Sequence, residues 1–300
     1  MKKSSLLLFL CMLIAVSISA QSSKVVRING TRFTLPLADK WIQSFNKEYP
    51  AIKVEIAPRG TSADSLDLQL VAYKVPADKI PLNKKLVRIN RYAQLPVTNV
   101  NNPALVQYNK TGITKEKFKS LYFAEASAGS APNQVHIYKR EISACASVAF
   151  AEHFGETFED IKGVKVAGDD KNLIESVKKD VNGITYNNLG FIYNLETRKV
   201  NDGLAIIPLD LNNNGTLDED EKIYDNLDKV LARIDLGNAS EIPVDYVSII
   251  YPEKTSNSNA STFLNWVLKN SEKLNKENGY LNLPETEKIK SQSVAENLKK

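Results

Sequence analysis

Residues 25–57 read VVRINGTRFTLPLADKWIQSFNKEYPAIKVEIA, and this stretch decides the fold. It opens with a short apolar strand at Val25–Ile28. From Leu37 to Tyr49 a large apolar residue recurs every four positions, which is the spacing of the buried face of a helix. Pro50 ends this helix, and Lys53–Ile56 has the composition of a second strand. The stretch therefore predicts a β-α-β unit with parallel strands.

The rest of the chain continues to alternate between strand-like and helix-like segments, which is typical of the α/β fold class. Further strands are expected at Leu86–Ile89, Gln134–Tyr138, Val164–Ala167, Gly190–Tyr193, Leu204–Ile207 and Val244–Tyr251. Further helices are expected at Ser65–Val71, Thr114–Tyr122, Ala144–Phe154, Leu173–Val181 and Phe263–Leu274. The polar residues 285–300 are expected to form a surface helix or a tail.

Residues 1–20 have the pattern of a secretory signal peptide. Lys2 and Lys3 precede the apolar run Leu6–Val16, and small residues lead to a cleavage point near Gln21. The run is too short to span a bilayer. We therefore expect a soluble periplasmic protein, and retention at the membrane by an uncleaved signal is the alternative.

The size and charge of the remaining chain narrow the class of protein. Of the 300 residues about 280 remain, enough for two lobes that each have a core. The net charge of +4 falls to +2 without Lys2 and Lys3, so no basic field indicates a nucleic acid partner. Once Cys11 is removed, only Cys145 is left, and an internal disulfide is excluded. We expect a monomer.

Three short segments share a design in which a strand ends, small or hydroxylated residues follow and a helix starts. They are Asn29–Thr34, Arg59–Ala63 and Arg140–Cys145. Helix starts present unpaired N–H groups, so several converging starts would bind an anion. Each segment alone is also an ordinary cap. Arg140 matters most, because a guanidinium can hold two oxygens of one phosphate or carboxylate.

No constellation of catalytic residues is present in the sequence. It has no phosphate-binding Walker loop, no Gly-x-Ser-x-Gly elbow and no zinc helix with two histidines. We interpret His136 and His153, the only two histidines, as structural. The chain is therefore expected not to be an enzyme.

Taken together, these segments resemble the phosphate-binding protein of the high-affinity phosphate ABC transporter, a type II solute-binding protein. The resemblance extends over about Val25–Pro284 and is carried by the order of its motifs. These are Gly-Thr-x-Phe at 30–33, Leu35-Pro36-Leu37 with Trp41, Gly60-Thr61-Ser62, Arg140-x-x-Ser143 and Gly279-Tyr280-Leu281-Asn282-Leu283-Pro284.

The resemblance implies a two-lobed periplasmic-binding-protein-like fold (type II), with mixed sheets flanked by helices and a ligand cleft between the lobes. Lobe 1 would comprise 21–92 and 240–284, and lobe 2 would comprise 93–239. The hinge crossings are expected near Arg91–Val97 and Leu236–Val244.

It also implies a dehydrated phosphate held by N–H groups, hydroxyls, one arginine and one aspartate. Asp67 most resembles that aspartate, which would accept the proton of a protonated phosphate that sulfate lacks. Where the family has Ser-Gly-Thr after its arginine, this chain has Ser143-Ala144-Cys145, so a thiol replaces a hydroxyl donor. Carried over, the ligand-binding residues are Thr31, Phe33, Thr61, Ser62, Asp67, Arg140, Ser143, Ala144 and Cys145.

Residues 210–221, DLNNNGTLDEDE, fit the twelve-residue calcium loop of EF-hands at every specified position. Gly215 permits its sharp turn, although Asn-Gly runs also make plain turns. A strand rather than a helix precedes the loop. We therefore expect a single loop held together by calcium within lobe 2, and not a pair of calcium-sensing EF-hands. The expected metal ligands are Asp210, Asn212, Asn214, Thr216, Asp218 and Glu221.

The main functional hypothesis is therefore capture of phosphate or a related small oxyanion, with delivery to a membrane ABC transporter permease. A non-transport binding or adhesion module that kept the fold but lost or changed the ligand is the first alternative. A phosphate-handling hydrolase is the second.

Overall fold

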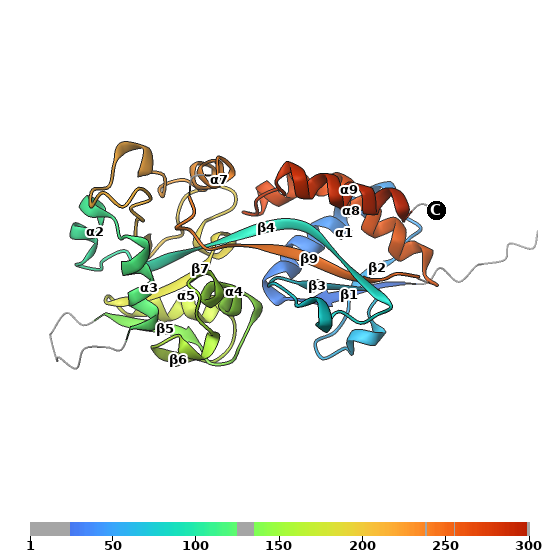
Figure 1. Cartoon of the computed structure of the whole chain (residues 1–300), viewed down its shortest axis with the longest axis horizontal. Coiled ribbons are helices and arrows are strands. Elements are labelled where there is room, and N and C mark those ends of the chain that lie inside the picture. The colour runs from blue at the N-terminus through green and yellow to red at the C-terminus, as the bar shows by residue number, and fades with distance from the viewer. Residues whose placement is uncertain (1–24, 125–134, 238, 255, 299–300) are drawn as a thin grey trace, which may run out of the picture.

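The computed structural model describes residues 25–124, 135–237, 239–254 and 256–298. Two bodies lie end to end along the long axis of the molecule, and two long strands run from one to the other (Figure 1). The buried apolar residues form two separate cores. We call the body that carries the first and last helices lobe 1 and the other lobe 2.

Lobe 1 begins with the predicted β-α-β unit. Strand β1 (Val26–Gly30) pairs in parallel with β2 (Val54–Ile56), and helix α1 (Leu35–Glu48) connects them. The buried face of α1 contains Leu37, Trp41 and Phe45, as the four-residue spacing predicts. Tyr49 is the exception, since the helix ends at Glu48 and the Tyr49 side chain is 39% exposed.

The helix predicted at Ser65–Val71 is wrong. A short 3-10 turn, η2 (Ala63–Ser65), leads into strand β3 (Leu68–Val71), which lies between β1 and β9 (Val244–Pro252). Leu68 and Leu70 are both buried, which is the alternation of a strand rather than the period of a helix. The segment is too short for sequence to separate the two patterns.

Two long strands join the lobes. Strand β4 (Lys84–Asn99) runs antiparallel to β9, with a register shift between Arg88 and Asn90. The two cores divide between Tyr92 and Ala93 on β4, and between Ile242 and Val247 near the start of β9. The predicted hinge segments lie at these crossings, while the predicted lobe boundaries stay predictions.

Lobe 2 continues the sheet from β4. Strand β7 (Gly183–Asn188) is antiparallel to β4, and β5 (His136–Arg140) is parallel to both β7 and β6 (Val164–Val166). The complete order is β2-β1-β3-β9-β4-β7-β5-β6, with β8 (Leu204–Ile206) paired to β4.

The strand predicted at Gly190–Tyr193 is also wrong, because this segment contains helix α6 (Leu189–Ile192). The strand is β7, immediately before it. All six residues of β7 are buried, including Asn187 and Asn188, so it has no alternation of apolar and polar residues for the sequence to reveal.

Helices cover both lobes. The remaining ones are α2 (Leu105–Thr111), α3 (Lys115–Phe123), α4 (Cys145–His153), α5 (Asp170–Lys179), α7 (Leu227–Asp235), α8 (Ser258–Glu277) and α9 (Glu285–Asn297). Helix α4 contributes to both cores, since Ala146 and Ala149 pack into lobe 1 whereas Phe150 and Ala151 pack into lobe 2. The start of α4 therefore lies where the lobes meet.

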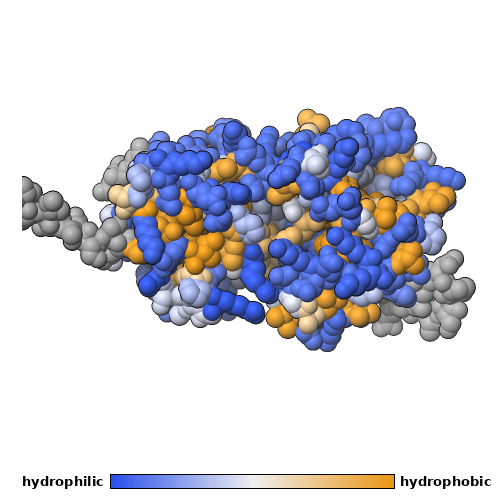
Figure 2. Space-filling model, turned by 180° about the vertical axis from the view of Figure 1, so that it is seen from behind, coloured by the Kyte–Doolittle hydropathy of each residue, from blue (hydrophilic) through white to orange (hydrophobic). Residues whose placement is uncertain are grey.

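The whole is a two-lobed α/β structure with a mixed sheet flanked by helices, which confirms the predicted fold class. From behind, most of the surface is hydrophilic and hydrophobic residues lie in separate patches (Figure 2). In the described part of the chain, no helix is long and apolar enough to cross a membrane. The predicted signal peptide at 1–20, with Cys11, lies outside the described residues.

Candidate functional site

The first of the three predicted turns follows β1. Gly30 has φ +144°, and a Cβ built there would lie 2.0 Å from the Leu70 carbonyl oxygen on β3. The next residue, Thr31, donates its backbone N–H to the same oxygen across 3.0 Å. Only glycine permits this close approach of two strands, so it places Thr31 at the carboxyl end of the lobe 1 sheet.

The third turn meets the first across the boundary between the lobes. Arg140 ends β5 and Cys145 begins α4, so the turn joins the edge of the lobe 2 sheet to a helix start. The Cys145 Sγ lies 3.0 Å from the Thr31 Oγ1. Of the three predicted turns, the structure therefore brings the first and third into direct contact.

The Arg140 side chain is only 2% exposed. Its Nη1 donates to Oδ1 of Asp170 across 3.0 Å. Its Nε and Nη2 are buried and have no hydrogen-bond partner among the described residues. Leaving a buried charged donor unpaired is costly, and a planar guanidinium holds its free N–H groups in a fixed direction. Arg140 therefore offers buried donors suited to an acceptor with several oxygens.

Asp170 was not among the predicted site residues. It opens helix α5, and its backbone carbonyl accepts a hydrogen bond from Asn187 Nδ2 at 2.8 Å. Burial raises the pKa of Asp170, and the Arg140 guanidinium acts in the opposite direction. In sequence it follows Gly168-Asp169, which reads only as a helix cap, and nothing there indicates its partner thirty residues upstream.

Further residues of both lobes surround this pair. Arg32 of the first turn donates from Nη2 to the Gly168 carbonyl at 3.4 Å, a second link between the lobes. Tyr92 is buried on β4, and its hydroxyl donates to the Ala72 carbonyl at 2.8 Å. Burial raises the pKa of Tyr92, and charges on Asp245, Cys145 and Asp170 raise it further. Tyr92 thus lies near Asp170 and the start of α4.

Phe33 lies beside this region rather than in contact with Arg140. It is 7% exposed, its ring centroid is 4.8 Å from that of Tyr92, and its carbonyl accepts the Tyr280 hydroxyl at 2.9 Å. The Phe33 backbone is therefore held in place by the segment after α8.

The second turn uses its hydroxyls locally. Thr61 Oγ1 donates to the Pro58 carbonyl at 2.7 Å, and Ser62 Oγ accepts the Asp64 N–H at 3.4 Å. The turn lines a groove of ≈ 540 Å³ that lies beside the first turn. Arg32 and Arg59 also line this groove. The structure places the second turn next to the first but gives its side chains no contact with Arg140.

Asp67 lies apart from the other predicted residues. It precedes β3 and accepts hydrogen bonds from the Arg27 backbone N–H at 2.8 Å and from Asn257 Nδ2 at 3.0 Å. Leu70, three residues later, is level with Gly30, so Asp67 is about 10 Å further back along the sheet. In this position its carboxylate links the start of β3 to Arg27 on β1 and to Asn257.

Ser143 and Ala144 complete the third turn. Ser143 is exposed, and Ala144 is the N-cap of α4 with an extended backbone and no side-chain cap. These residues leave the first N–H groups of α4 without a hydroxyl cap, next to the contact between Cys145 and Thr31.

The predicted calcium loop folds around two fully buried carboxylates. Asp210 accepts the Asn214 and Gly215 backbone N–H groups, and Glu221 accepts those of Leu211, Asn212 and Asp218. Among the described residues, no three acidic, histidine or cysteine side chains are gathered closely enough to hold a metal ion. The calcium site, with Asn212, Asn214 and Thr216, stays a prediction.

Comparison with solved structures shows a shared fold. A phosphate ABC transporter substrate-binding protein from Clostridium perfringens, described as putative and solved with bound phosphate, is 17% identical, with a TM-score of 0.64 over 87% of this chain and 100% of that one. An ABC-type phosphate transport receptor from Vibrio cholerae is 15% identical, with a TM-score of 0.60 over 86% and 100%.

The likeness extends to proteins of another kind. The regulatory domain of Synechocystis CcmR, solved in complex with 2-PG, is 12% identical, with a TM-score of 0.51 over 81% of this chain and 95% of that one. No curated protein matches the sequence. A family model described as a PBP superfamily domain matches residues 15–271. That match covers most of the chain, which therefore belongs to the periplasmic binding protein (PBP) superfamily.

Proposed function

We propose that this protein is an extracytoplasmic solute-binding protein that captures phosphate or a related small oxyanion for uptake by an ABC transporter. The observation that carries the proposal is the buried Arg140 guanidinium with two unpartnered nitrogen donors. A tetrahedral oxyanion presents several acceptor oxygens and satisfies such a fork better than water does.

The charge balance of the site supports an anion held by directed hydrogen bonds. Asp170 compensates the charge of Arg140, so the pair presents little net positive charge. An anion must therefore be bound mainly by donors that point at it: the free guanidinium N–H groups, the start of α4 and the side chains of Thr31 and Cys145. Such a site needs no basic surface, in keeping with the modest net charge of the chain.

Asp170 also offers a physical basis for choice between oxyanions. It lies beside the free donors and its carboxylate would repel a fully ionised anion, whereas a protonated phosphate can donate a hydrogen bond to it. We propose Asp170 in the discriminating role that the sequence suggested for Asp67.

Two of the solved structures of this fold support the ligand class, because one is described as a phosphate transport receptor and another contains phosphate. By the same likeness we propose a membrane permease as the partner and an extracytoplasmic location, as the signal-like residues 1–20 suggest. We also propose that the protein acts as a monomer without catalysis.

We further propose that loop 210–221 binds calcium. Buried Asp210 and Glu221 are spaced as a calcium loop requires, and Asp218 Oδ2 is contacted by the Asn212 and Asn214 amides. On binding, the amide oxygens would have to turn toward the ion and the carboxylates draw closer.

Isothermal titration with phosphate and with sulfate tests the main proposal. We expect heat from phosphate with the parent protein, much weaker binding of sulfate, and loss of binding in Arg140→Met. Because that variant leaves Asp170 unpaired, the double variant Arg140→Met/Asp170→Asn removes both buried charges together. Arg27→Met, at an exposed arginine of β1 that pairs with Glu55 outside the three turns, is the matched control and should bind normally. If neither phosphate nor sulfate gave heat with the folded parent protein, a binding module with another ligand would be favoured.

A further inference from the structure

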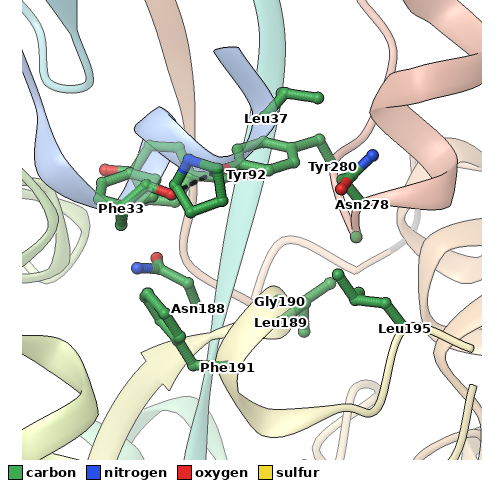
Figure 3. Close-up of a pocket in the computed structure, with 12 residues that line it drawn as sticks. Phe33, Leu37, Tyr92, Asn188, Leu189, Gly190, Phe191, Leu195, Asn278 and Tyr280 are labelled. Atoms are coloured by element: carbon green, nitrogen blue, oxygen red, sulfur yellow. Dashed lines mark hydrogen bonds between the residues drawn. The ribbon is translucent and has the colours of Figure 1, made fainter. Parts of the chain in front are cut away.

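A second cavity lies between the lobes, and Arg140 is not among the residues that line it. It measures ≈ 50 Å³ and is partly open to solvent. Phe33, Tyr92 and Tyr280 lie on one side, and Asn188, Leu189 and Phe191 on the other (Figure 3). The first group comes from lobe 1 and its crossings, the second from the β7–α6 junction of lobe 2.

Asn188 is the unexplained group in this cavity. Its side chain is 5% exposed, and neither Oδ1 nor Nδ2 has a hydrogen-bond partner among the described residues. It is the N-cap residue of α6, yet it makes no side-chain cap. A buried amide without partners carries the full desolvation cost of each unsatisfied group. Such a cost is retained where a ligand supplies the missing bonds.

The other polar groups of the wall are already engaged. The Tyr92 hydroxyl donates to the Ala72 carbonyl, the Tyr280 hydroxyl to the Phe33 carbonyl, and Asn278 Nδ2 to the Leu274 carbonyl. None of the residues that line the cavity is charged. Among the described side chains of the wall, that of Asn188 is the one buried with both its donor and its acceptor unpartnered, so the wall offers an occupant apolar contact and this donor–acceptor edge.

This edge selects a chemical class. A primary carboxamide carries a carbonyl oxygen and an N–H on one planar edge, so it can pair with both groups of Asn188 at once. A carboxylate leaves Oδ1 without a donor and meets no cation, and a ketone satisfies Nδ2 alone. A flat amide also packs well against aromatic rings, and Phe33, Tyr92 and Tyr280 line one side of the cavity and Phe191 the other.

The size of the cavity sets the size of the group. A single water molecule needs about 10–15 Å³ of cavity volume, counted as the space open to the centre of a water-sized sphere. The ≈ 50 Å³ of this cavity therefore accepts a group of a few non-hydrogen atoms. That is the size of a terminal carboxamide with a short apolar stem. The partly open wall lets a longer molecule continue outward.

We propose that this cavity is a binding site for a small primary carboxamide, either free or as the end of a larger molecule, with Asn188 as its hydrogen-bonding residue. Phe33 of the first turn lines the cavity but Arg140 does not, so binding here does not depend on the free guanidinium donors that carry the oxyanion proposal.

Titration of the ¹⁵N-labelled protein with acetamide, acetone and acetate, followed by NMR, tests the proposal. The three probes have equal numbers of non-hydrogen atoms but differ in the edge they present. For a probe this small we expect millimolar binding of acetamide, with shifts at the Asn188 side-chain NH₂ and at the backbone of 189–191. We expect at least fivefold weaker binding of acetone and acetate.

Variants assign the binding to Asn188. Asn188→Leu should abolish the acetamide shifts, while Asn46→Leu, at an exposed position of α1, should leave them unchanged. The mapping on the parent protein stands even if Asn188→Leu does not fold. Equal binding of acetone and acetamide, shifts that lie elsewhere, or a crystal soaked in acetamide that shows only water at Asn188 would each overturn the proposal. A result for Arg140→Met on phosphate has no bearing on it.

Discussion

Thr31 Oγ1 and Cys145 Sγ lie 3.0 Å apart although 114 residues separate them in the chain. Thr31 follows the first strand of lobe 1, and Cys145 begins the helix that packs into both cores. The contact therefore joins the lobes at the point where two helix starts and the end of β5 converge. A thiol is a weak hydrogen-bond donor, so this contact contributes little to the free energy that holds the two lobes together.

Replacing Cys145 by serine should strengthen oxyanion binding. A hydroxyl in place of the thiol adds a better donor at the start of α4, and one hydrogen bond is worth about 0.5–1.5 kcal/mol. We therefore expect a phosphate dissociation constant about threefold to tenfold lower for Cys145→Ser by isothermal titration. Cys145→Ala serves as the control for side-chain size and should not gain affinity. Equal affinities for all three proteins would show that residue 145 does not touch the ligand.

Gly30 should tolerate substitution much less well than Gly155, although both have positive φ. A Cβ at Gly30 would overlap the Leu70 carbonyl at 2.0 Å, whereas nothing lies within 4 Å of one at Gly155. Gly30→Ala must push β1 away from β3, which we expect to destabilise the protein by about 3 kcal/mol. Gly155→Ala carries only the conformational cost of a helix C-cap, about 1 kcal/mol. Urea denaturation measures both, and equal losses would refute the steric explanation.

The sequence predicted the elements of the fold whose signal is local. The β-α-β unit was readable because Leu37, Trp41 and Phe45 repeat at the helical period beside two short apolar runs. Strand β3 was missed because the spacing of Leu68, Leu70 and Val71 fits a short helix as well as a strand. Strand β7 was missed because it is buried on both faces. In both cases the sheet partners, rather than the segment itself, decide the conformation.

Some residues of the candidate site could likewise be recognised from local sequence, and others could not. Arg140 could be singled out because an arginine between a strand and a helix start has a recognisable chemistry. Asp170 and Asn188 could not, since what distinguishes them is a tertiary partner or the lack of one. Asp67 had a plausible position in the sequence, but the register of β3 against β1 places it well behind the turn.

Calcium should bind to loop 210–221 and stabilise lobe 2. Isothermal titration of the metal-free protein is expected to show one site, which is lost in Glu221→Gln because the bidentate carboxylate is removed. A filled site should also raise the midpoint of thermal unfolding with calcium concentration. Glu219→Gln, at an exposed carboxylate within the loop that is not an expected metal ligand, is the matched control. No heat from the parent protein would end the calcium proposal.

His153 should make the protein less stable in mild acid. Burial, with a smaller contribution from the Lys115 charge, lowers the pKa of His153 from 6.5 to about 4. The unfolded chain therefore binds a proton near pH 6.5 that the folded protein does not accept until about pH 4, so stability is full above pH 6.5 and falls as pH decreases between these values. Because the ring is only partly buried, we expect a loss of about 1–2 kcal/mol.

Urea denaturation at pH 7 and at pH 4.5 measures this loss. His153→Gln removes the titrating group and should flatten the dependence between the two pH values. His136→Gln is the control, because the His136 side chain is 49% exposed and pairs with Asp180 on the surface of lobe 2. If His153→Gln kept the full dependence of the parent, other groups would have to cause it. The carboxylates with raised pKa, Asp170 and Asp245, act in the opposite direction, since their protonation stabilises the fold as the pH falls.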